Sequence, residues 1–242
     1  MNVGLTDRQT RILKAIIDEY IETTLPVGSM ALEKKYTLGV SPATIRNEMA
    51  TLTKMNYLRQ PHTSAGRVPS PVAMKFYINQ LMEEKKLSVA EEVKAKENVW
   101  DSRNNFDQLM EGIARSLAKR TGALAVVATT DGAVWSHGHS NIFKNPETFN
   151  FNMCQTLFSM LDESKLLAEL FFQRITGVSP IEILFGEELG WKYFEPVSIV
   201  ATRFETKDHS GTLAAVGFFS QPYHTVIPLV RYYKGLITEL HQ

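Results

Sequence analysis

The chain has 242 residues, a hydrophobic content of 44% and equal numbers of basic and acidic residues, 26 of each. That length suits one large domain or two smaller ones, and the zero formal charge excludes a uniformly basic or acidic protein. The charge is unevenly spread, because residues 1–78 hold 10 Lys and Arg against 6 Asp and Glu, whereas residues 79–242 hold 16 against 20. This asymmetry favours a module that faces nucleic acid, joined to one that does not.

The cysteine content argues against a disulfide-stabilised secreted protein, and the hydropathy pattern argues against a membrane-spanning one. Cys154 is the single cysteine, so no intramolecular disulfide can form and nothing indicates an oxidising compartment. Residues 1–10 lack the apolar core of a signal peptide, and the sequence contains no run of about 18 apolar residues, which is the length needed to cross a bilayer. We expect a soluble, cytoplasmic protein that makes no membrane contact.

Three helices are predicted at the start of the chain. The first opens with the capping-box sequence Thr6-Asp7-Arg8-Gln9 and continues with apolar residues at helical spacing, which are Ile12, Leu13, Ile16, Ile17, Tyr20 and Ile21. Ser29 is expected to cap a short second helix, and Gly39 marks the break before the third. The third begins at Ser41, a good N-cap, with Pro42 at the first helical position, where no N–H is needed.

The third helix has one apolar face and one small, polar face. At about 100° per residue, Ile45, Met49 and Leu52 gather on one side. The opposite side holds Ala43, Asn47, Ala50, Thr51 and Lys54, with Thr44 and Arg46 at its margins. Such a face lets the backbone approach base edges, where asparagine can pair with adenine through the oxygen and the nitrogen of its amide, and threonine or alanine methyls can contact thymine. We interpret this helix as a DNA-recognition helix.

A short hairpin with a basic tip is predicted after this helix. Residues 57–60 and 67–69 have the pattern of two strands, joined through residues 61–66, in which Gly66 is expected to supply the conformational freedom of a turn. The cationic side chains that cluster there are Arg59, His62 and Arg67. A basic hairpin beside a recognition helix positions a protein on the DNA backbone, and a plain surface turn is the alternative. Three helices and this wing predict a winged helix-turn-helix DNA-binding domain over residues 1–78.

This segment closely resembles one bacterial family. The stretches that carry the resemblance are LTDRQTRILKAIIDEYIETTLPVGS, SPATIRNEMA and above all YLRQPHTSAGRVP, in which residues 60–67 are the specific part. They are similar to the N-terminal half of the HrcA family, the heat-inducible transcription repressors of bacteria. The residues that we expect to contact DNA are Ser41, Ala43, Thr44, Arg46, Asn47, Thr51, Lys54, Arg59, Gln60, His62, Thr63, Ser64 and Arg67.

Residues 79–100 are strongly charged and are predicted to form a solvated linker helix. Glu92 and Lys96 make a favourable i,i+4 pair, and the apolar side of the helix is sparse. A dimerising coiled coil is the alternative, although heptads are not sustained.

Residues 101–242 are predicted to form an α+β domain with an antiparallel sheet. Apolar residues at helical spacing from Phe106 to Leu117 predict an amphipathic helix that ends before Gly122. Asp131-Gly132 is a hairpin signal between strands at 124–128 and 133–135. Further strands fit 181–185, 197–204 and 212–219, and further helices fit 151–160, 165–172 and 226–240. This layout resembles the GAF-like regulatory or dimerisation domain of HrcA proteins, but the chain is too short for the inserted dimerising segment that the family usually carries.

No catalytic or metal-binding constellation is expected. His137, His139 and Cys154 form the single cluster that resembles zinc ligands, yet no further ligand has a recognisable spacing, and we favour a surface loop and a core cysteine. Glu187 and Glu188 are expected in a solvated turn at a strand end. One stripe at helical spacing is expected to be core rather than a cofactor pocket, and it comprises Phe149, Phe151, Met153, Leu157, Phe158 and Met160.

These patterns lead to one functional hypothesis and one alternative. We expect a DNA-binding transcriptional repressor that is not an enzyme, needs no cofactor or metal, and binds an inverted-repeat operator in double-stranded DNA as a homodimer. The resemblance to HrcA implies control of chaperone genes, release on heat stress and a partnership with the GroE chaperonin. The alternative is a small-molecule-sensing winged-helix regulator with its ligand in the GAF-like domain.

The last helix carries a seam of apolar residues at three- and four-residue steps, which are Val226, Val230, Tyr233, Ile237 and Leu240. Such a seam suits packing against another helix or sheet. We expect this helix to pack within its own domain, and a contact across the two-fold axis of a dimer is the alternative.

Overall fold

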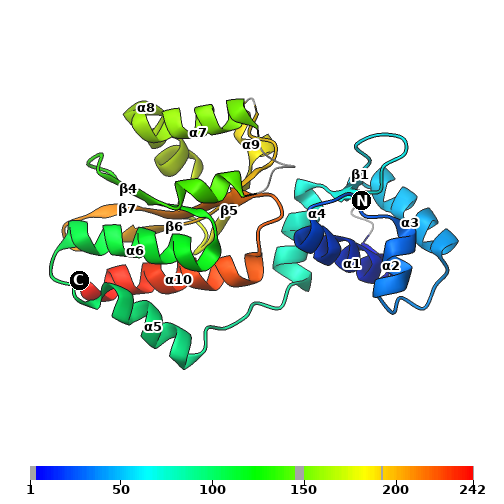
Figure 1. The fold of residues 1–242 in the computed structure, drawn as a ribbon, viewed down its shortest axis with the longest axis horizontal. Coiled ribbons are helices and arrows are strands. Elements are labelled where there is room, and N and C mark those ends of the chain that lie inside the picture. Colours follow the sequence, from blue (N-terminus) through cyan, green and yellow to red (C-terminus); the bar gives the residue numbers. More distant parts are fainter. Residues whose placement is uncertain (1–3, 145–149, 192, 242) are drawn as a thin grey trace. The chain divides into compact units, whose positions relative to one another are not determined.

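The computed structural model describes residues 4–144, 150–191 and 193–241. The chain divides into two compact units, residues 1–83 and 84–242 (Figure 1). Each unit has buried apolar residues of its own, and each is described here by itself.

Three helices open the first unit, and they are α1 (Asp7–Thr23), α2 (Ser29–Lys35) and α3 (Pro42–Lys54). The predicted capping box forms at α1, and the Ser41 hydroxyl caps α3 by accepting a hydrogen bond from the Thr44 N–H. The prediction that Ser29 caps α2 is wrong. Gly28 has the extended backbone of an N-cap, and Ser29 is the buried first residue of the helix.

Two short strands and a further helix complete the first unit. Strands β1 (Leu58–Arg59) and β2 (Val68–Pro69) pair antiparallel, with Leu58 opposite Pro69. Helix α4 (Pro71–Phe76) follows and continues into a π-helical segment, η1 (Tyr77–Leu81). The Ser70 hydroxyl joins these elements, because it donates to the Asn56 carbonyl at 2.6 Å and accepts from the Ala73 N–H at 3.2 Å.

The helix predicted over residues 79–100 is shorter than expected. The π-helical segment ends at Leu81, and α5 (Val89–Trp100) begins only after Ser88, which caps it together with Glu91. Residues 82–88 are not helical. The capping box explains the late start, because Ser88 and Glu91 satisfy two backbone N–H groups at that position.

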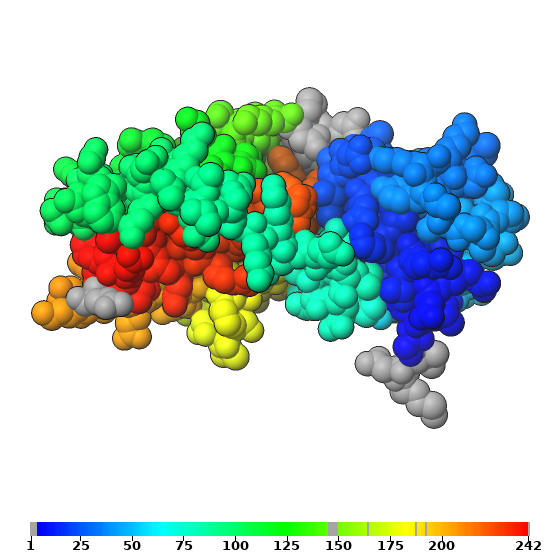
Figure 2. Space-filling model, turned by 90° about the horizontal axis from the view of Figure 1, so that it is seen from below, coloured from blue at the N-terminus to red at the C-terminus, as the bar shows by residue number. Residues whose placement is uncertain are grey.

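Helix α5 packs on the second unit instead of standing in solvent. Its residues Ala95 and Val99 are buried, and Lys96 Nζ lies 2.8 Å from a carboxylate oxygen of Glu239 in α10 (Tyr223–Leu240). Figure 2 shows the green residues of α5 beside the red residues of α10 on one face of this unit. The expected solvated linker helix is therefore one layer of the second unit.

A five-stranded antiparallel sheet forms the centre of the second unit. The strands are β3 (Leu124–Thr129), β4 (Val134–His137), β5 (Glu182–Phe185), β6 (Val197–Glu205) and β7 (Ser210–Phe218). Their order in space is β4-β3-β7-β6-β5, and the predicted hairpin joins β3 to β4 with Gly132 at φ 98°. In this register Ile199 lies opposite Val216. The prediction of an α+β chain with an antiparallel sheet is confirmed.

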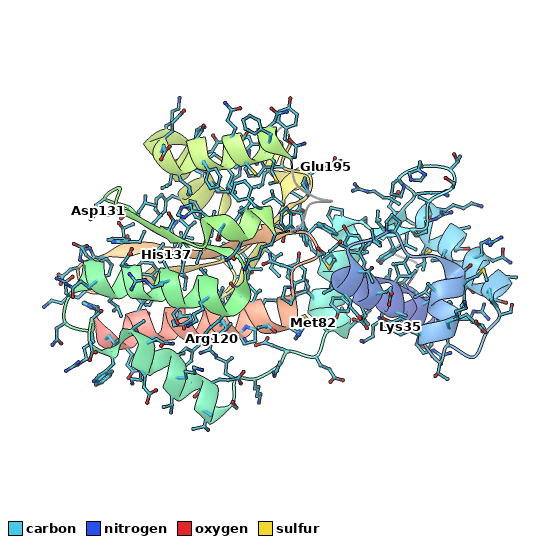
Figure 3. All side chains as sticks on the ribbon, viewed as in Figure 1. Lys35, Met82, Arg120, Asp131, His137 and Glu195 are labelled. Atoms are coloured by element: carbon cyan, nitrogen blue, oxygen red, sulfur yellow. The ribbon has the colours of Figure 1, made fainter. Side chains whose placement is uncertain are left out.

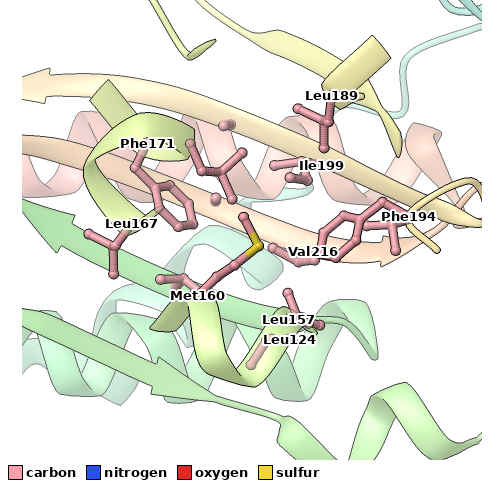
Figure 4. Packing of buried hydrophobic residues seen from close by; sticks show 14 of the residues in the cluster. Leu124, Leu157, Met160, Leu167, Phe171, Leu189, Phe194, Ile199 and Val216 are labelled. Carbon is pink, nitrogen blue, oxygen red and sulfur yellow. The ribbon is translucent and has the colours of Figure 1, made fainter. Parts of the chain in front are cut away.

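Helices cover both faces of this sheet (Figure 1). Helices α6 (Phe106–Thr121) and α10 pack on one face, and the predicted end of α6 is confirmed by Gly122, a left-handed C-cap. The other face carries α7 (Phe151–Asp162), α8 (Ser164–Ala168) and the π-helical η3 (Glu169–Arg174). Figure 4 shows Met160 and Phe171 from these helices packed with Ile199 and Val216 of the sheet. No helix among the described residues has both the length and the apolar character that crossing a bilayer requires.

The expectation that α10 packs within its own domain is confirmed for most of the seam. Val226, Val230, Tyr233 and Ile237 are fully buried, while Leu240 is half-buried. The Tyr233 hydroxyl also shares a 2.5 Å hydrogen bond with the Ser116 hydroxyl of α6. This polar contact fixes the two helices against each other beneath the sheet.

Two expectations for the second unit need correction. Phe151 does not join the core, because it occupies the first position of α7 and is 70% exposed; Phe149 lies outside the described residues. Residues 187–188 are in a one-turn helix, α9 (Gly186–Leu189), and not in an irregular turn. The Glu188 carboxylate accepts a hydrogen bond from the Phe185 N–H at 3.1 Å, which favours this helical turn at the strand end.

Candidate nucleic-acid interface

The outer face of α3 presents the side chains that the sequence predicts at the DNA. The exposed residues of this face are Ala43, Arg46, Asn47, Ala50, Thr51 and Lys54. Ile45 and Leu52 on the opposite face are fully buried. Thr44 is half-buried, and its hydroxyl lies 3.1 Å from the Ser41 hydroxyl at the start of the helix. The Asn47 amide makes no hydrogen bond within the described part of the chain and can pair with a ligand.

Glu48 holds α3 against α1, and sequence reasoning missed it. The residue is only 8% exposed, yet its carboxylate accepts hydrogen bonds from Arg8 Nε at 2.7 Å and from Gln9 Nε2 at 3.1 Å. Arg8 Nη2 lies 2.6 Å from the same carboxylate. A buried carboxylate needs such partners, because removing an unpaired charge from water is costly. This contact therefore sets the orientation of α3 on the unit.

The hairpin is attached to the body of the unit at its stem. Val27 and Arg67 exchange two backbone hydrogen bonds, each 2.8 Å long, and form an isolated antiparallel bridge. Gly66 is required here for a different reason than the predicted one. It does not adopt a positive φ, but a Cβ at this position would lie 2.4 Å from the Val27 carbonyl oxygen. Close approach of two backbones, and not turn conformation, excludes a side chain at residue 66.

The wing loop is braced by Gln60. Its amide nitrogen donates to the carbonyls of Thr63 at 2.9 Å and Ala65 at 3.1 Å, which closes the loop from inside. At the tip, His62 Nδ1 lies 3.1 Å from the Ser64 hydroxyl. The side chains of His62, Thr63 and Ser64 remain exposed, so they can contact a ligand, whereas Gln60 Nε2 is committed to the loop.

A cleft of about 400 Å³ separates the wing from α3. Its lining brings together Arg46 of α3 with Gln60, Thr63, Ser64 and Arg67 of the wing. Arg67 is half-buried, and its Nε donates to the Thr53 hydroxyl at 3.1 Å. Five of the predicted DNA-binding residues thus share one surface.

The other predicted residues lie outside this cleft. Asn47, Thr51 and Lys54 follow the outer face of α3, and Arg59 is exposed on β1. With two exposed arginines, an exposed lysine and the half-buried Arg67, this surface can attract a polyanion and present amide and hydroxyl groups to it.

The other cluster that the sequence singled out does not form a metal site. Figure 3 labels His137 on β4. Its Nε2 lies 2.6 Å from a Glu111 carboxylate oxygen, and this hydrogen bond lowers the pKa of Glu111. His139 Nε2 lies 3.1 Å from the Ser136 hydroxyl, and Cys154 is buried, which raises the pKa of its thiol. Within the described ranges, no three His, Cys, Asp or Glu side chains are placed to hold a metal ion.

Comparison with known proteins places the chain in a family. A family model described as the HrcA protein C-terminal domain matches residues 70–227, which is more than half of the chain. The chain belongs to the HrcA family. The HrcA model covers most of the second unit and the end of the first, so it is independent of the wing sequence that carries the resemblance in the N-terminal part.

Curated relatives carry the same family name. The Heat-inducible transcription repressor HrcA of Carboxydothermus hydrogenoformans is 46% identical over 127 residues, which is 52% of this chain and 37% of that protein. The corresponding HrcA of Symbiobacterium thermophilum is 43% identical over 124 residues, 51% of this chain and 36% of the relative. In these alignments the chain spans little more than a third of the relatives' own length.

A third HrcA relative aligns along nearly the whole chain. The protein of Desulforudis audaxviator is 26% identical over 330 residues, and the alignment covers 95% of this chain and 96% of that protein. Because the alignment is longer than the 242-residue chain, the relative carries segments that this HrcA chain lacks. A crystal structure of a hypothetical protein at 2.2 Å resolution has a TM-score of 0.80 at 17% identity, covers 98% of this chain and 99% of its own, and shares the fold.

Proposed function

We propose that this chain is a DNA-binding transcriptional repressor of heat-shock genes. The observation that carries the proposal is the exposed polar face of α3 next to a basic hairpin, with one cleft between them. The net charge of +4 over residues 1–78 favours contact with phosphates, which supply most of the affinity of DNA-binding proteins. The relatives named Heat-inducible transcription repressor HrcA support this assignment.

Within this proposal, residues 1–78 are the DNA-binding domain and the two faces have different tasks. Asn47, Thr44 and Arg46 read base edges in the major groove, because they lie on or beside the face of α3 that points away from the core. Lys54, Arg59 and the wing contact phosphates and fix the register on the duplex. The other proposed contacts come from Ser41, Ala43, Thr51, Gln60, His62, Thr63, Ser64 and Arg67.

Repression in this scheme needs no chemical step. A homodimer, held by residues 101–242, would place two recognition helices on successive major-groove faces of an inverted repeat and so exclude polymerase. The protein would act in the cytoplasm, and heat would release it from operators upstream of chaperone genes. The GroE chaperonin is the proposed partner that maintains the DNA-competent form. Two half-sites also supply the interface area that one winged helix lacks for tight specific binding.

An unbiased selection of DNA bound by the full-length chain tests the proposal directly. The expected product is an inverted repeat whose affinity for the protein exceeds that of random DNA by at least about a thousandfold. Sedimentation equilibrium of the same sample should show a dimer at micromolar concentration. No enriched sequence, or binding of random and selected DNA with equal affinity, would contradict a repressor function.

Asn47→Ala then tests the reading face. Loss of a bidentate amide contact should cost about 1 to 3 kcal/mol of discrimination. The ratio of the affinities for operator and random DNA should therefore fall about fivefold to 150-fold. Because the Asn47 side chain is exposed, the fold should be unaffected. Asn79→Ala is the matched control, since Asn79 is an exposed asparagine in η1 of the same unit. An unchanged ratio in competition binding would remove Asn47 from the reading face.

A further inference from the structure

One face of α5 is apolar and exposed. Val89, Val93 and Trp100 are 77%, 50% and 42% exposed. At about 100° per residue these three side chains fall within a sector of about 40°, and Lys96 lies next to them. We call these four residues the outer stripe, and their steps of four, three and four positions are those of a coiled-coil seam. Single exposed apolar residues are common, but a continuous stripe along one helix marks an interaction surface.

The opposite face of α5 already packs on the second unit. Ala95 and Val99 are buried, and the Tyr232 hydroxyl of α10 donates to the Glu92 carbonyl at 2.9 Å. In Figure 1, α5 lies on the outer side of α10, away from the sheet. Because the helix is held by its inner face, the outer stripe cannot turn inward, and it stays available to a partner from outside the second unit.

Trp100 is held in one orientation although it is exposed. Lys96 Nζ lies 5.2 Å from the centroid of its ring, and the Arg103 guanidinium carbon lies 4.6 Å from the same centroid. Arg103 Nη1 also donates to the Trp100 carbonyl at 2.8 Å. An ordered ring loses little conformational freedom when a partner covers it, and tryptophan is enriched among the residues that contribute most to interface affinity. Trp100 is therefore the side chain on which a docked partner would be anchored.

The spacing of the outer stripe fits a second copy of the same helix that runs in the antiparallel direction. A two-fold axis at the midpoint of α5 would place Val89 against the partner's Trp100 and Val93 beside the partner's Lys96, so each position of the stripe meets another. A parallel copy would instead place Lys96 opposite the partner's Lys96, and two ammonium groups in one layer repel each other. The stripe is therefore complementary to itself in the antiparallel direction.

The charges beside the stripe favour the same arrangement. The Glu92 side chain is exposed, makes no ion pair within the described part of the chain, and lies on the same flank of the stripe as Lys96. In the antiparallel pair this carboxylate comes close to the partner's Lys96, and the two-fold axis makes the contact twice. We propose that α5 packs antiparallel against α5 of a second copy of this chain. This inference rests on the proposed dimeric repressor, to which it adds a contact beside residues 101–242.

Sedimentation equilibrium of the full-length chain without DNA tests the contact. Val93→Lys should raise the dissociation constant of the dimer at least about tenfold, because it replaces an apolar side chain by a second ammonium group beside the partner's Lys96. Val178→Lys is the matched control, since Val178 is 88% exposed outside α5, and it should leave the constant unchanged. Equal constants in the two variants, or an unmodified chain that stays monomeric at about 100 μM, would overturn the proposal. Unfolding of Val93→Lys alone would also overturn it, because the stripe would then be covered by its own chain.

Thiol crosslinking tests the direction of the pair. Cys154 is buried, so a cysteine introduced on the outer stripe supplies the accessible thiol. At 1.5 Å per residue, the antiparallel pair separates the two copies of position 89 by about 16 Å along the helix axis and those of position 93 by about 4 to 5 Å. A short bismaleimide should therefore bridge Val93→Cys dimers and leave Val89→Cys unbridged, whereas equal bridging would refute the antiparallel arrangement. If these tests failed while the chain still selected an inverted repeat, the repressor function would stand and only this surface would be wrong.

Discussion

Replacing Glu48 by alanine should loosen α3 without changing the surface that we propose for DNA binding. The carboxylate is buried and accepts one hydrogen bond from Arg8 and one from Gln9, and Arg8 Nη2 forms an ion pair with it at 2.6 Å. Hydrogen bonds of charged groups contribute about 1.5 to 3 kcal/mol each. The Arg8 side chain is 53% exposed, so it recovers water when its partner is removed. The net loss should therefore be about 1 to 3 kcal/mol, below the cost of breaking a fully buried ion pair.

Hydrogen exchange of the full-length chain measures this loss where it occurs. A destabilisation of about 1 to 3 kcal/mol should make the slowest amides of α3 exchange about fivefold to 150-fold faster, while amides of the five-stranded sheet stay protected. Arg11→Ala, an exposed arginine on the same helix as Arg8, is the matched control for Arg8→Ala. If Glu48→Ala and Arg8→Ala lowered α3 protection additively in the double variant, the two groups would not be coupled and the reasoning would fail.

Three further outcomes are expected. Lys54→Ala should reduce the magnitude of the slope of log affinity against log salt by about 1 per contacting subunit, and an unchanged slope would remove Lys54 from the phosphate contacts. Arg67→Ala should reduce this slope too and should also lower the free energy of unfolding by about 1 kcal/mol, because the Arg67 Nε donates a hydrogen bond to the Thr53 hydroxyl. Gly66→Ala should destabilise the first unit by about 1 to 3 kcal/mol in urea unfolding, and a neutral effect would show that the stem can yield. Hydrogen bonding to His137 lowers the pKa of Glu111, so the Glu111 carboxylate stabilises the fold above its unfolded pKa of about 4.3, and this stabilisation is lost as the pH falls through the folded pKa. A carboxyl NMR titration should find the Glu111 pKa higher in the His137→Ala variant than in the unmodified protein, and no change would refute the pairing.

Much of the fold follows from local patterns that the sequence displays openly. The caps at Thr6 and Ser41, the Asp131-Gly132 hairpin and the apolar periodicity of α6 each act within a few residues, and each appears where predicted. The start of α5 differs from the predicted helix over residues 79–100, although Ser88 and Glu91 form a capping box that marks this start in the sequence.

The parts that the sequence did not reveal depend on contacts between distant residues. Counting about 100° per residue does place Glu48 on the buried face of α3, yet only the folded unit brings Arg8 and Gln9 to it. The role of Gly66 likewise depends on Val27, a residue far away along the chain. Local rules identify the exposed polar face of α3, whereas contacts between distant residues decide how that face is oriented.

The residues that hold the wing in its conformation differ from the tip residues that can contact a ligand. Gln60 holds carbonyl oxygens of the loop, and Gly66 meets a carbonyl of Val27, so both anchors act on main-chain atoms. The side chains at positions 62 to 64 can therefore be exchanged without altering the path of the loop. If the chain binds DNA as we propose, new tip residues grafted onto an unchanged stem should change which sequences it prefers.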